Sequence, residues 1–217
     1  MKKRAFVSNG PAPRPANQPR LFYYLTWTHP YIPIGLYLVF SAGLVWWTYS
    51  QVGLALAAVV GLFFAGLTMF TFVEYLVHRY VFHMFEVDDH TKKWTPHKQH
   101  GIHHDYPKDI NRLAMPPLAS IAVASVFFYL FSYILDDYSY SFTAGFLSGY
   151  ALYLIVHYVI HVYRPPNNAL KYLWIYHSIH HYQNEEVYYG VTSPMWDHIF
   201  GTVLQEEPTE VRAEDRH

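Results

Sequence analysis

Residues 52–83 read VGLALAAVVGLFFAGLTMFTFVEYLVHRYVFH, an apolar run, uncharged as far as Val73, that continues without a break into two histidines. As one continuous α-helix this stretch would be about 48 Å long, because each residue adds about 1.5 Å. The hydrocarbon layer of a bilayer is only ~30 Å thick, so such a helix would cross it and extend beyond the surface. The stretch therefore predicts a membrane helix that carries histidines to the membrane surface.

Three further stretches have the same character. Residues 31–49 carry no formal charge, and residues 118–135 and 140–160 are apolar stretches separated by the short polar sequence DDYS. Each approaches the ~20 apolar residues that a spanning helix needs. We therefore expect an all-α integral membrane protein with four transmembrane helices, arranged as two hairpins, and a cytosolic histidine-rich helical cap. The alternative is a soluble bundle with helices that are apolar all round, which is hard to accommodate in 217 residues.

The basic residues predict the orientation. All 15 Lys and Arg lie in the N-terminal tail, between Arg79 and Arg112, or after His161, and the turns of both hairpins have none. The positive-inside rule then places both termini and the central segment in the cytosol, under a bacterial inner membrane or an endoplasmic reticulum membrane. We expect a cytosolic tail at 1–30, a membrane-bound domain at 31–205 and an acidic tail at 206–217.

The composition excludes several classes of protein. The chain has no cysteine, which excludes disulfide scaffolds, thiolate-held iron–sulfur clusters and cysteine nucleophiles. Its 15 Lys and Arg balance 16 Asp and Glu to a formal net charge of −1, so we expect no nucleic-acid partner. Any bound metal must therefore have nitrogen or oxygen ligands.

Four short segments hold ten of the 15 histidines: HRYVFH at 78–83, HGIHH at 100–104, HYVIH at 157–161 and HSIHH at 177–181. Residues four apart share a helix face, so His157 and His161 can reach one ion. In HxxHH the first and last histidines share a face, and the middle one points about 100° away, toward a second ion. His78 and His83 are five apart, so the helix is expected to end or loosen before His83. All four segments fall on the predicted cytosolic side, where they can form one site for two metals.

The identity of the metals has to come from the chemistry. A structural zinc site uses four ligands, fewer than are present here, and neutral imidazole accepts zinc, copper, iron or nickel alike. A zinc hydrolase would not need to face a bilayer. A non-haem diiron centre activates O2 and oxidises the unactivated C–H bonds of lipid chains, so we expect two iron ions, which zinc can replace in a purified protein.

Two alternatives belong to other classes. A histidine-rich metal transporter would place ionisable groups near the bilayer midplane, where these helices have almost none. A haem protein with two histidine ligands would place them facing each other inside the bundle.

Other residues are candidates for supporting roles. Metal-bound histidines usually donate their second ring N–H to a carboxylate or carbonyl. The candidate carboxylates are Glu74, one turn before His78, Asp105, beside His104, and Asp197, after Trp196. Aromatic side chains collect at membrane interfaces, and the candidates to line a lipid entrance are Tyr158, Tyr182, Tyr188 and Tyr189. The alternative is that the carboxylates cap turns or meet solvent and that the tyrosines only pack.

The order of these motifs between two membrane hairpins resembles the fatty acid hydroxylase superfamily, and most closely the sphingolipid fatty acid 2-hydroxylases. The resemblance covers residues 74–202 and includes EYLVHRYVFHM at 74–84, RL at 112–113 before PP at 116–117, and WD at 196–197. It implies an O2-dependent oxidoreductase, a monooxygenase of lipid metabolism that hydroxylates an acyl chain taken from the bilayer at the 2-position. Carotenoid and sterol hydroxylases or desaturases of the same superfamily are the alternatives.

The resemblance also implies how the ligands are divided. One ion would be bound by His78, His83, His100, His104 and His181, and the other by His103, His157, His161, His177 and His180. This division agrees with the four-residue spacing at 100/104 and 157/161, but not at 177/181. The chain lacks the cytochrome b5 domain often fused to eukaryotic members, so a separate cytochrome b5- or ferredoxin-type electron donor is expected. Leu154 stands where an Asp is expected, which leaves the substrate class open.

Overall fold

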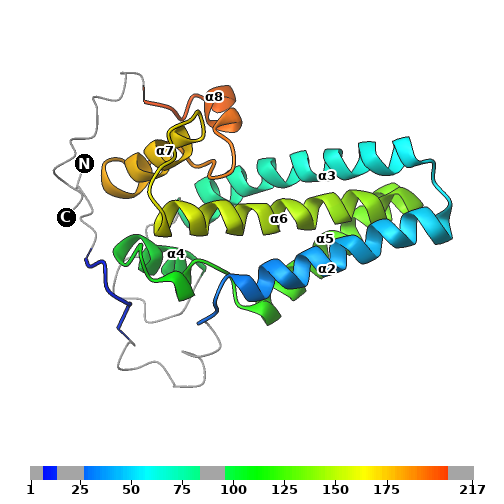
Figure 1. Cartoon of the computed structure of the whole chain (residues 1–217), viewed down its shortest axis with the longest axis horizontal. Coiled ribbons are helices and arrows are strands. Elements are labelled where there is room, and N and C mark those ends of the chain that lie inside the picture. The colour runs from blue at the N-terminus through cyan, green and yellow to red at the C-terminus, as the bar shows by residue number, and fades with distance from the viewer. Residues whose placement is uncertain (1–6, 14–26, 84–95, 205–217) are drawn as a thin grey trace.

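The computed structural model describes residues 7–13, 27–83 and 96–204, without the side chains of 96–99, and every regular element in this part of the chain is a helix. The long helices are α2 (Tyr31–Trp47), α3 (Leu56–Leu76), α5 (Pro117–Leu135) and α6 (Ser139–Val162). The shorter α4 (Pro96–Asp105), α7 (Lys171–Tyr182) and α8 (Met195–Phe200) gather at one end of them (Figure 1). The acidic tail at 206–217 and most of the N-terminal tail lie outside the described residues.

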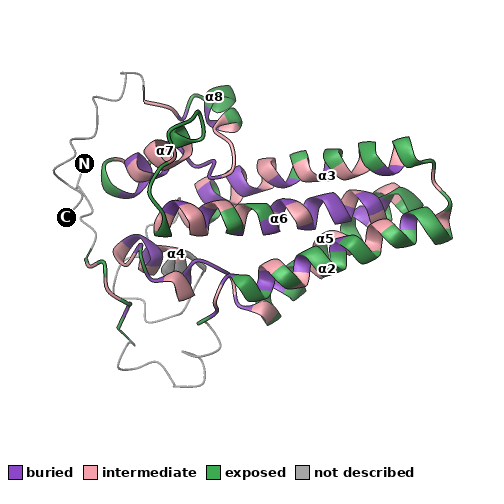
Figure 2. Ribbon diagram, viewed as in Figure 1, coloured by how far each residue is buried: buried purple, intermediate pink, exposed green. Residues whose placement is uncertain are grey.

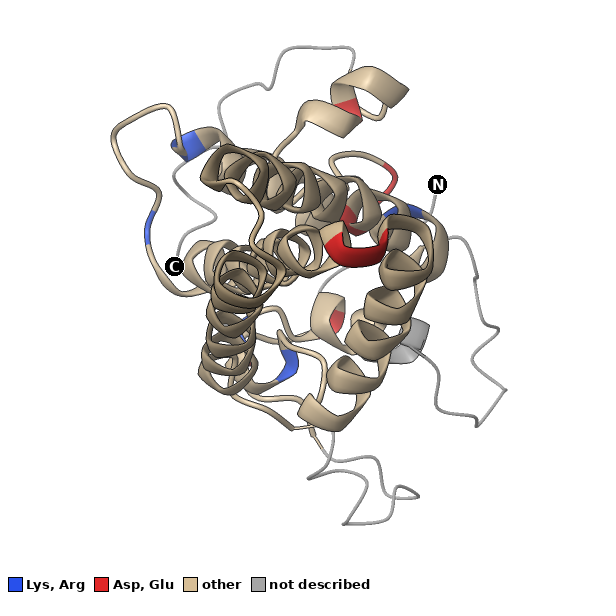
Figure 3. Cartoon of the chain, turned by 90° about the vertical axis from the view of Figure 1, so that its right-hand side faces the viewer, with Lys and Arg blue, Asp and Glu red and all other residues tan. Residues whose placement is uncertain are grey.

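Both hairpins turn close to the predicted positions. The first turns through a π-helix, η1 (Thr48–Val52), and Gly53 follows it with φ 75°, a left-handed conformation that glycine adopts without a steric penalty. The second turns at the 3₁₀-helix η4 (Asp136–Tyr138). Figure 3 looks onto this end of the molecule, where η4 carries acidic residues and neither turn has a Lys or Arg. The two turns therefore lie together at the end opposite α4, α7 and α8.

Helix α6 is the centre of the bundle and packs against α2, α3 and α5. Its contact with α3 is made by glycines. A Cβ atom on Gly145 would lie 1.8 Å from the carbonyl oxygen of Phe63, and one on Gly66 would lie 1.9 Å from that of Phe142. Only glycine allows two backbones to approach this closely. The contact fixes the relative position of the two long helices that carry histidine segments.

The outer faces of the bundle are apolar and exposed, whereas much of α6 is buried (Figure 2). Val39, Leu118 and Tyr133 are 73%, 75% and 89% exposed. Apolar surface of this extent suits contact with lipid rather than water. Three segments are long and apolar enough to cross a membrane: Tyr31–Val52, Leu56–Phe82 and Ile110–Val162. The third includes both α5 and α6 and reverses at η4, and the count of four spans stays a prediction.

Candidate metal centre

The four histidine segments meet at the end of the bundle where the short helices gather (Figure 1). They come from η2 (Val77–Phe82), which continues α3 as a π-helix, and from α4, α6 and α7. The ten side chains form two sets of five, and in each set one ring nitrogen per residue lies within 4.8 Å of the others. The first histidine group is His78, His83, His100, His104 and His180, and the second is His103, His157, His161, His177 and His181.

In the first group the Nε2 atoms converge around His100. Nε2 of His100 lies 3.1 Å from Nε2 of His78 and 3.0 Å from Nε2 of both His83 and His104. Nδ1 of His78 contacts the carbonyl oxygen of Tyr189, which can only accept, so this nitrogen carries the proton. In the neutral His78 ring, Nε2 then carries a lone pair, which is directed at the neighbouring histidine rings. Convergent lone pairs of this kind suit a shared cation.

The second group is equally close-packed. Nε2 of His161 lies 3.1 Å from Nε2 of His157 and 2.9 Å from Nε2 of His177. The ring of His103 lies 4.7 Å from the rings of three other members. Both ring nitrogens of His103 and His181 are buried without a hydrogen-bond partner in the described part of the chain. An unpaired buried polar atom costs about 1–3 kcal/mol, which binding of an ion would offset.

Burial keeps these histidines neutral. Desolvation lowers the pKa of His177, His180 and His181 well below the usual value of 6.5, and neighbouring histidines lower it further. Desolvation acts in the same direction on the pKa of His103 and His104 in α4. A neutral imidazole offers a lone pair to a metal, and a protonated one does not. The two groups therefore fit two metal ions with nitrogen ligands.

Helix type determines which histidines share a group. In the π-helix η2 each turn is wider than in an α-helix, which brings His78 and His83, five residues apart, to the same group. The prediction that the helix loosens before His83 is confirmed. In α4 the four-residue spacing places His100 with His104, and His103 points to the second group.

Comparison with known proteins gives the family. Residues 63–202 match the family model described as fatty acid hydroxylase. The chain belongs to the fatty acid hydroxylase family. It is 36% identical over 157 residues to the ceramide very long chain fatty acid hydroxylase scs7 of Schizosaccharomyces pombe, covering 71% of this chain and 45% of that protein. It is 32% identical over 196 residues to the fatty acid 2-hydroxylase of Homo sapiens, covering 87% of this chain and 51% of the human protein. The chain thus spans about half the length of these two relatives.

A solved structure supports the fold. The structure of full-length scs7p, in which only the hydroxylase domain is visible, matches with a TM-score of 0.74 and 30% sequence identity. The match covers 83% of this chain and 69% of that one. The all-α fold class expected from the sequence is confirmed.

One part of the ligand division implied by the resemblance to fatty acid hydroxylases is wrong. The resemblance implies His181 in the first group and His180 in the second, and the structure places them the other way round. His177 and His181 are four apart on α7, and their rings lie 4.5 Å apart in the second group. His180 points to another side of α7, and its ring lies 4.6 Å from that of His78. For His180 and His181, the helical spacing in the sequence predicts the histidine group correctly, and the resemblance does not.

Main-chain carbonyls, rather than carboxylates, accept the ring N–H groups of two first-group histidines. Nδ1 of His78 donates to the carbonyl oxygen of Tyr189, and Nδ1 of His180 donates to that of Val187 at 2.8 Å. Residue types do not reveal these contacts, because every residue has a backbone carbonyl. The only available signal is Gly190, next to Tyr189, where the backbone makes a close approach.

The carboxylates of Glu74 and Asp197 are buried, and both accept hydrogen bonds from the loop at residues 189–192. Asp197 accepts from the backbone N–H of Tyr189 at 2.8 Å and from that of Gly190 at 2.9 Å. Burial raises the pKa of Asp197, and these hydrogen bonds lower it. Glu74 accepts from the N–H groups of residues 191 and 192 at 2.7 and 3.0 Å. Both predicted residues thus lie at the site, and their hydrogen bonds go to the loop.

Asp105, the third predicted carboxylate, ends α4 directly after His104. Its carbonyl oxygen accepts from the N–H groups of Val7 and Ser8 at 2.9 and 3.2 Å, which ties residues 7–13 to α4. A contact between its side chain and a metal ligand stays a prediction.

Two of the four tyrosines predicted at a lipid entrance are buried. The ring of Tyr188 stacks on that of Tyr176 at 4.4 Å, within a small apolar cluster that includes Ile179 and Val187. The ring of Tyr189 lies 5.6 Å from the rings of two first-group histidines. Tyr188 therefore packs away from the surface, and Tyr189 covers the first group.

The other two tyrosines are more accessible and lie on different elements. The ring of Tyr158, on α6, lies 5.4 Å from that of Tyr31 at the start of α2. Tyr182, at the end of α7, is 43% exposed, and its ring lies 6.0 Å from that of His181. The entrance role stays a prediction for Tyr158 and Tyr182.

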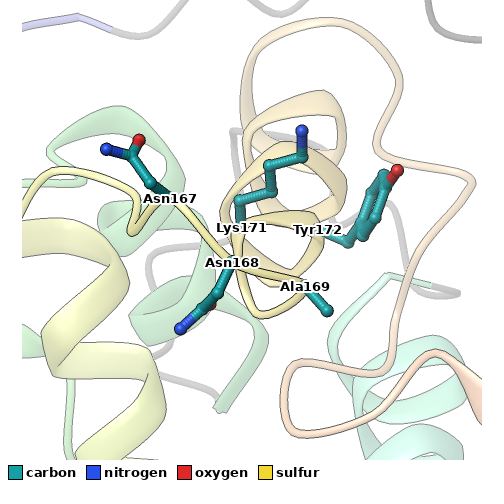
Figure 4. A pocket seen from close by; sticks show the side chains of 5 residues that line it. All are labelled: Asn167, Asn168, Ala169, Lys171 and Tyr172. Carbon is teal, nitrogen blue, oxygen red and sulfur yellow. The ribbon is translucent and has the colours of Figure 1, made fainter.

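A surface pocket of about 400 Å³ lies at the turn from α6 to α7 (Figure 4). It is lined by Asn167, Asn168, Ala169, Lys171 and Tyr172, whose side chains point in different directions. None of them belongs to either histidine group, so this pocket is not part of the candidate metal centre.

Proposed function

We propose that this chain is a membrane-bound monooxygenase that hydroxylates the acyl chain of a sphingolipid-type lipid at the 2-position. The observation that carries the proposal is the pair of buried, neutral histidine groups at the end of helices long enough to cross a membrane. The names of the relatives support the reaction: a ceramide very long chain fatty acid hydroxylase and a fatty acid 2-hydroxylase.

The position of the histidine groups supports hydroxylation next to the head group. Both groups lie at the ends of α3 and α6, beyond most of the apolar length of these helices. A lipid whose chain remains in the hydrocarbon layer therefore presents the carbon atoms nearest its head group. The 2-carbon of a fatty acyl chain is among these atoms.

The two groups would each hold one iron ion. When bound, a pair of iron ions supplies the activation of O2 that oxidation of an unactivated C–H bond requires. The protein's own contribution is to position ligands and exclude water. The ring of Phe82 stacks on that of His100 at 4.7 Å, and the ring of Tyr189 lies 5.7 Å from that of His78. Zinc would bind the same nitrogens but has no redox chemistry.

The proposed reaction needs an electron-donating partner on the side of the membrane where the metal centre lies. Each turnover consumes O2, two electrons and two protons and gives one hydroxyl group and one water. The chain has no cysteine to hold an iron–sulfur cluster. A cytochrome b5- or ferredoxin-type electron donor is the partner that we propose. The basic residues favour a cytosolic position for the metal centre and both termini.

Analysis of lipids tests the function. The chain and its His180→Ala and His181→Ala variants would be expressed with an electron donor, and lipid extracts compared by mass spectrometry. We expect one added oxygen at the 2-position with the wild type, at least a tenfold loss in both variants, and no loss for Asn167→Ala in the separate pocket. Oxygen on a carotenoid or sterol would favour the alternative substrates. Unchanged lipids with a competent donor would contradict a hydroxylase.

A further inference from the structure

Residues 185–192, which we call the support loop, contact the first histidine group on the side of the Nδ1 atoms of His78 and His180. The carbonyl oxygens of Tyr189 and Val187 accept from the Nδ1 atoms of His78 and His180. In both rings the loop therefore holds the nitrogen opposite Nε2. Hydrogen bonds of this kind set the orientation of a ligand ring before a metal binds.

A third member of the group faces the same loop. Nδ1 of His83 lies 3.9 Å from a carboxylate oxygen of Glu185, whereas Nε2 of His83 lies 3.0 Å from Nε2 of His100. Three of the five rings in the first group thus have their outer nitrogen directed at one short segment.

Two buried carboxylates fix the support loop itself. Asp197 accepts from two successive N–H groups, those of Tyr189 and Gly190, and its Oδ1 also accepts from the hydroxyl of Thr202 at 2.8 Å. Glu74 accepts from the N–H groups of residues 191–192 and from the hydroxyl of Thr192. A Cβ on Gly190 would lie 2.8 Å from Oδ2 of Asp197, so the loop lies directly against its anchor.

Among the described residues, no hydrogen bond joins the support loop to a ring of the second group. A buried ring nitrogen has no hydrogen-bond partner within the part of the chain that the structure describes in each of His103, His177 and His181. The backbone hydrogen bond that acts on His157 comes from Leu113, which lies outside the support loop. These rings are held by their helices and by one another. The two groups therefore differ in what orients their ligands.

We infer that Glu74 and Asp197 are positioning residues for the first metal site alone, acting through the backbone of the support loop. The inference rests on the proposed function only in assuming that both histidine groups bind metal. Loss of an anchor should release the ion of the first group and leave that of the second.

The two anchors differ in a way that makes the inference testable. An Asn at position 197 would direct an amide NH2 at one of the two backbone N–H groups, where an acceptor is needed. A Gln at position 74 can keep its carbonyl oxygen on the N–H groups of residues 191–192, and its NH2 can donate to the hydroxyl of Thr192. Asp197→Asn should therefore disrupt the loop, and Glu74→Gln should preserve it.

The experiment counts metal ions in the purified full-length chain. Each protein would be stripped, reloaded with Zn²⁺ and analysed by mass spectrometry, with about two ions per chain expected for the wild type. The second group would be emptied by His177→Ala with His181→Ala, and the first by His78→Ala with His180→Ala. Added to these backgrounds, Asp197→Asn should weaken Zn²⁺ binding by about 10–100-fold in the first group and leave it unchanged in the second.

Two further variants complete the design. Glu74→Gln should keep both ions, and so should Ser141→Ala, which removes a buried hydrogen bond to the carbonyl of Val59 far from the loop. The ion retained by the second group also reports that the variant is folded. Equal loss from both groups, or equal loss with Asp197→Asn and Glu74→Gln, would overturn the inference. A wild type that binds no Zn²⁺ would overturn the proposed metal centre as well.

Discussion

Gly190 is a position of the support loop with no space for a side chain. A Cβ atom there would lie 2.2 Å from the carbonyl oxygen of Ser193, a backbone atom that cannot move independently. Its neighbour Tyr189 contributes to the first group through its carbonyl oxygen, which any residue would supply. At Tyr189 and Gly190, the path of the backbone therefore matters more to the first histidine group than the side chains of these two residues do.

Gly190→Ala should therefore weaken the first metal site and lower the thermal stability of the protein. Overpacking of this kind typically costs about 1–3 kcal/mol. Tyr189→Phe is the matched control, because it keeps the carbonyl and should retain both ions. Thermal unfolding in detergent and metal analysis check both variants, and an unchanged midpoint for Gly190→Ala would show that the loop has room to adjust.

The α3–α6 contact matters at the scale of elements, because these two helices supply ligands to different histidine groups. A Cβ on Gly145 would lie 1.8 Å from a carbonyl oxygen of α3, so no rotamer relieves the clash and the helices must separate. Gly61, also on α3, faces outward, and a Cβ added there would meet nothing within 4 Å. Replacement of glycine by alanine thus causes a clash between helices at position 145 and no clash at position 61.

Gly145→Ala should lower the midpoint of thermal unfolding and the metal content together. Gly61→Ala should leave both unchanged or raise the midpoint, since alanine is favoured over glycine in helices by about 1 kcal/mol. Differential scanning fluorimetry and metal analysis on the two purified proteins make the comparison. Similar midpoints would mean that the glycine contact contributes little.

The helices are more predictable from the sequence than the connections between them. Apolar length and the absence of charge locate α2, α3, α5 and α6 to within a few residues, and the five-residue spacing of His78 and His83 indicates the departure from an α-helix at η2. Four-residue spacing also groups His177 with His181. The support loop is not predictable, because its contribution consists of carbonyl oxygens and N–H groups, and these depend on where the backbone lies in three dimensions.

At the scale of the whole molecule, the metal ions should hold the cap to the bundle. Helix α4 packs against η2 and against the 3₁₀-helix η3 (Ile110–Arg112), and α7 packs against α6. The histidine rings therefore form much of the link between the short helices and the long ones. Binding of an ion stabilises the folded state by ~4 kcal/mol when its concentration is a thousand times the dissociation constant.

Removal of metal with a chelator should therefore raise backbone hydrogen exchange in α4 and α7 and leave the centres of α3 and α6 protected. Mass spectrometry of exchange in detergent, with and without Zn²⁺, would show the difference. An equal rise in all helices would indicate instead that the metals support the entire fold.

The orientation in the membrane is testable because the chain has no native cysteine. Lys171→Cys places a thiol in the cap, and Asp137→Cys places one in η4 at the opposite end. With the chain expressed in the inner membrane of a bacterial host, a membrane-impermeant maleimide added to intact cells should label position 137 and not position 171, and both should react after lysis. The reverse pattern would contradict a cytosolic metal centre, and labelling of neither before lysis would contradict the exposed η4 turn of the second hairpin.

The adjacency of His180 and His181 constrains how the length of this chain can vary. A single residue inserted or deleted between His177 and His180 would turn each following ring by about 100°. One of the two histidines would then take the position of the other, and the other would turn away from both histidine groups. The stretch at 163–170, between α6 and α7, carries no ligand and is largely exposed, so it can lengthen or shorten freely. Natural length differences among related chains should accumulate in that connection and be absent within α7.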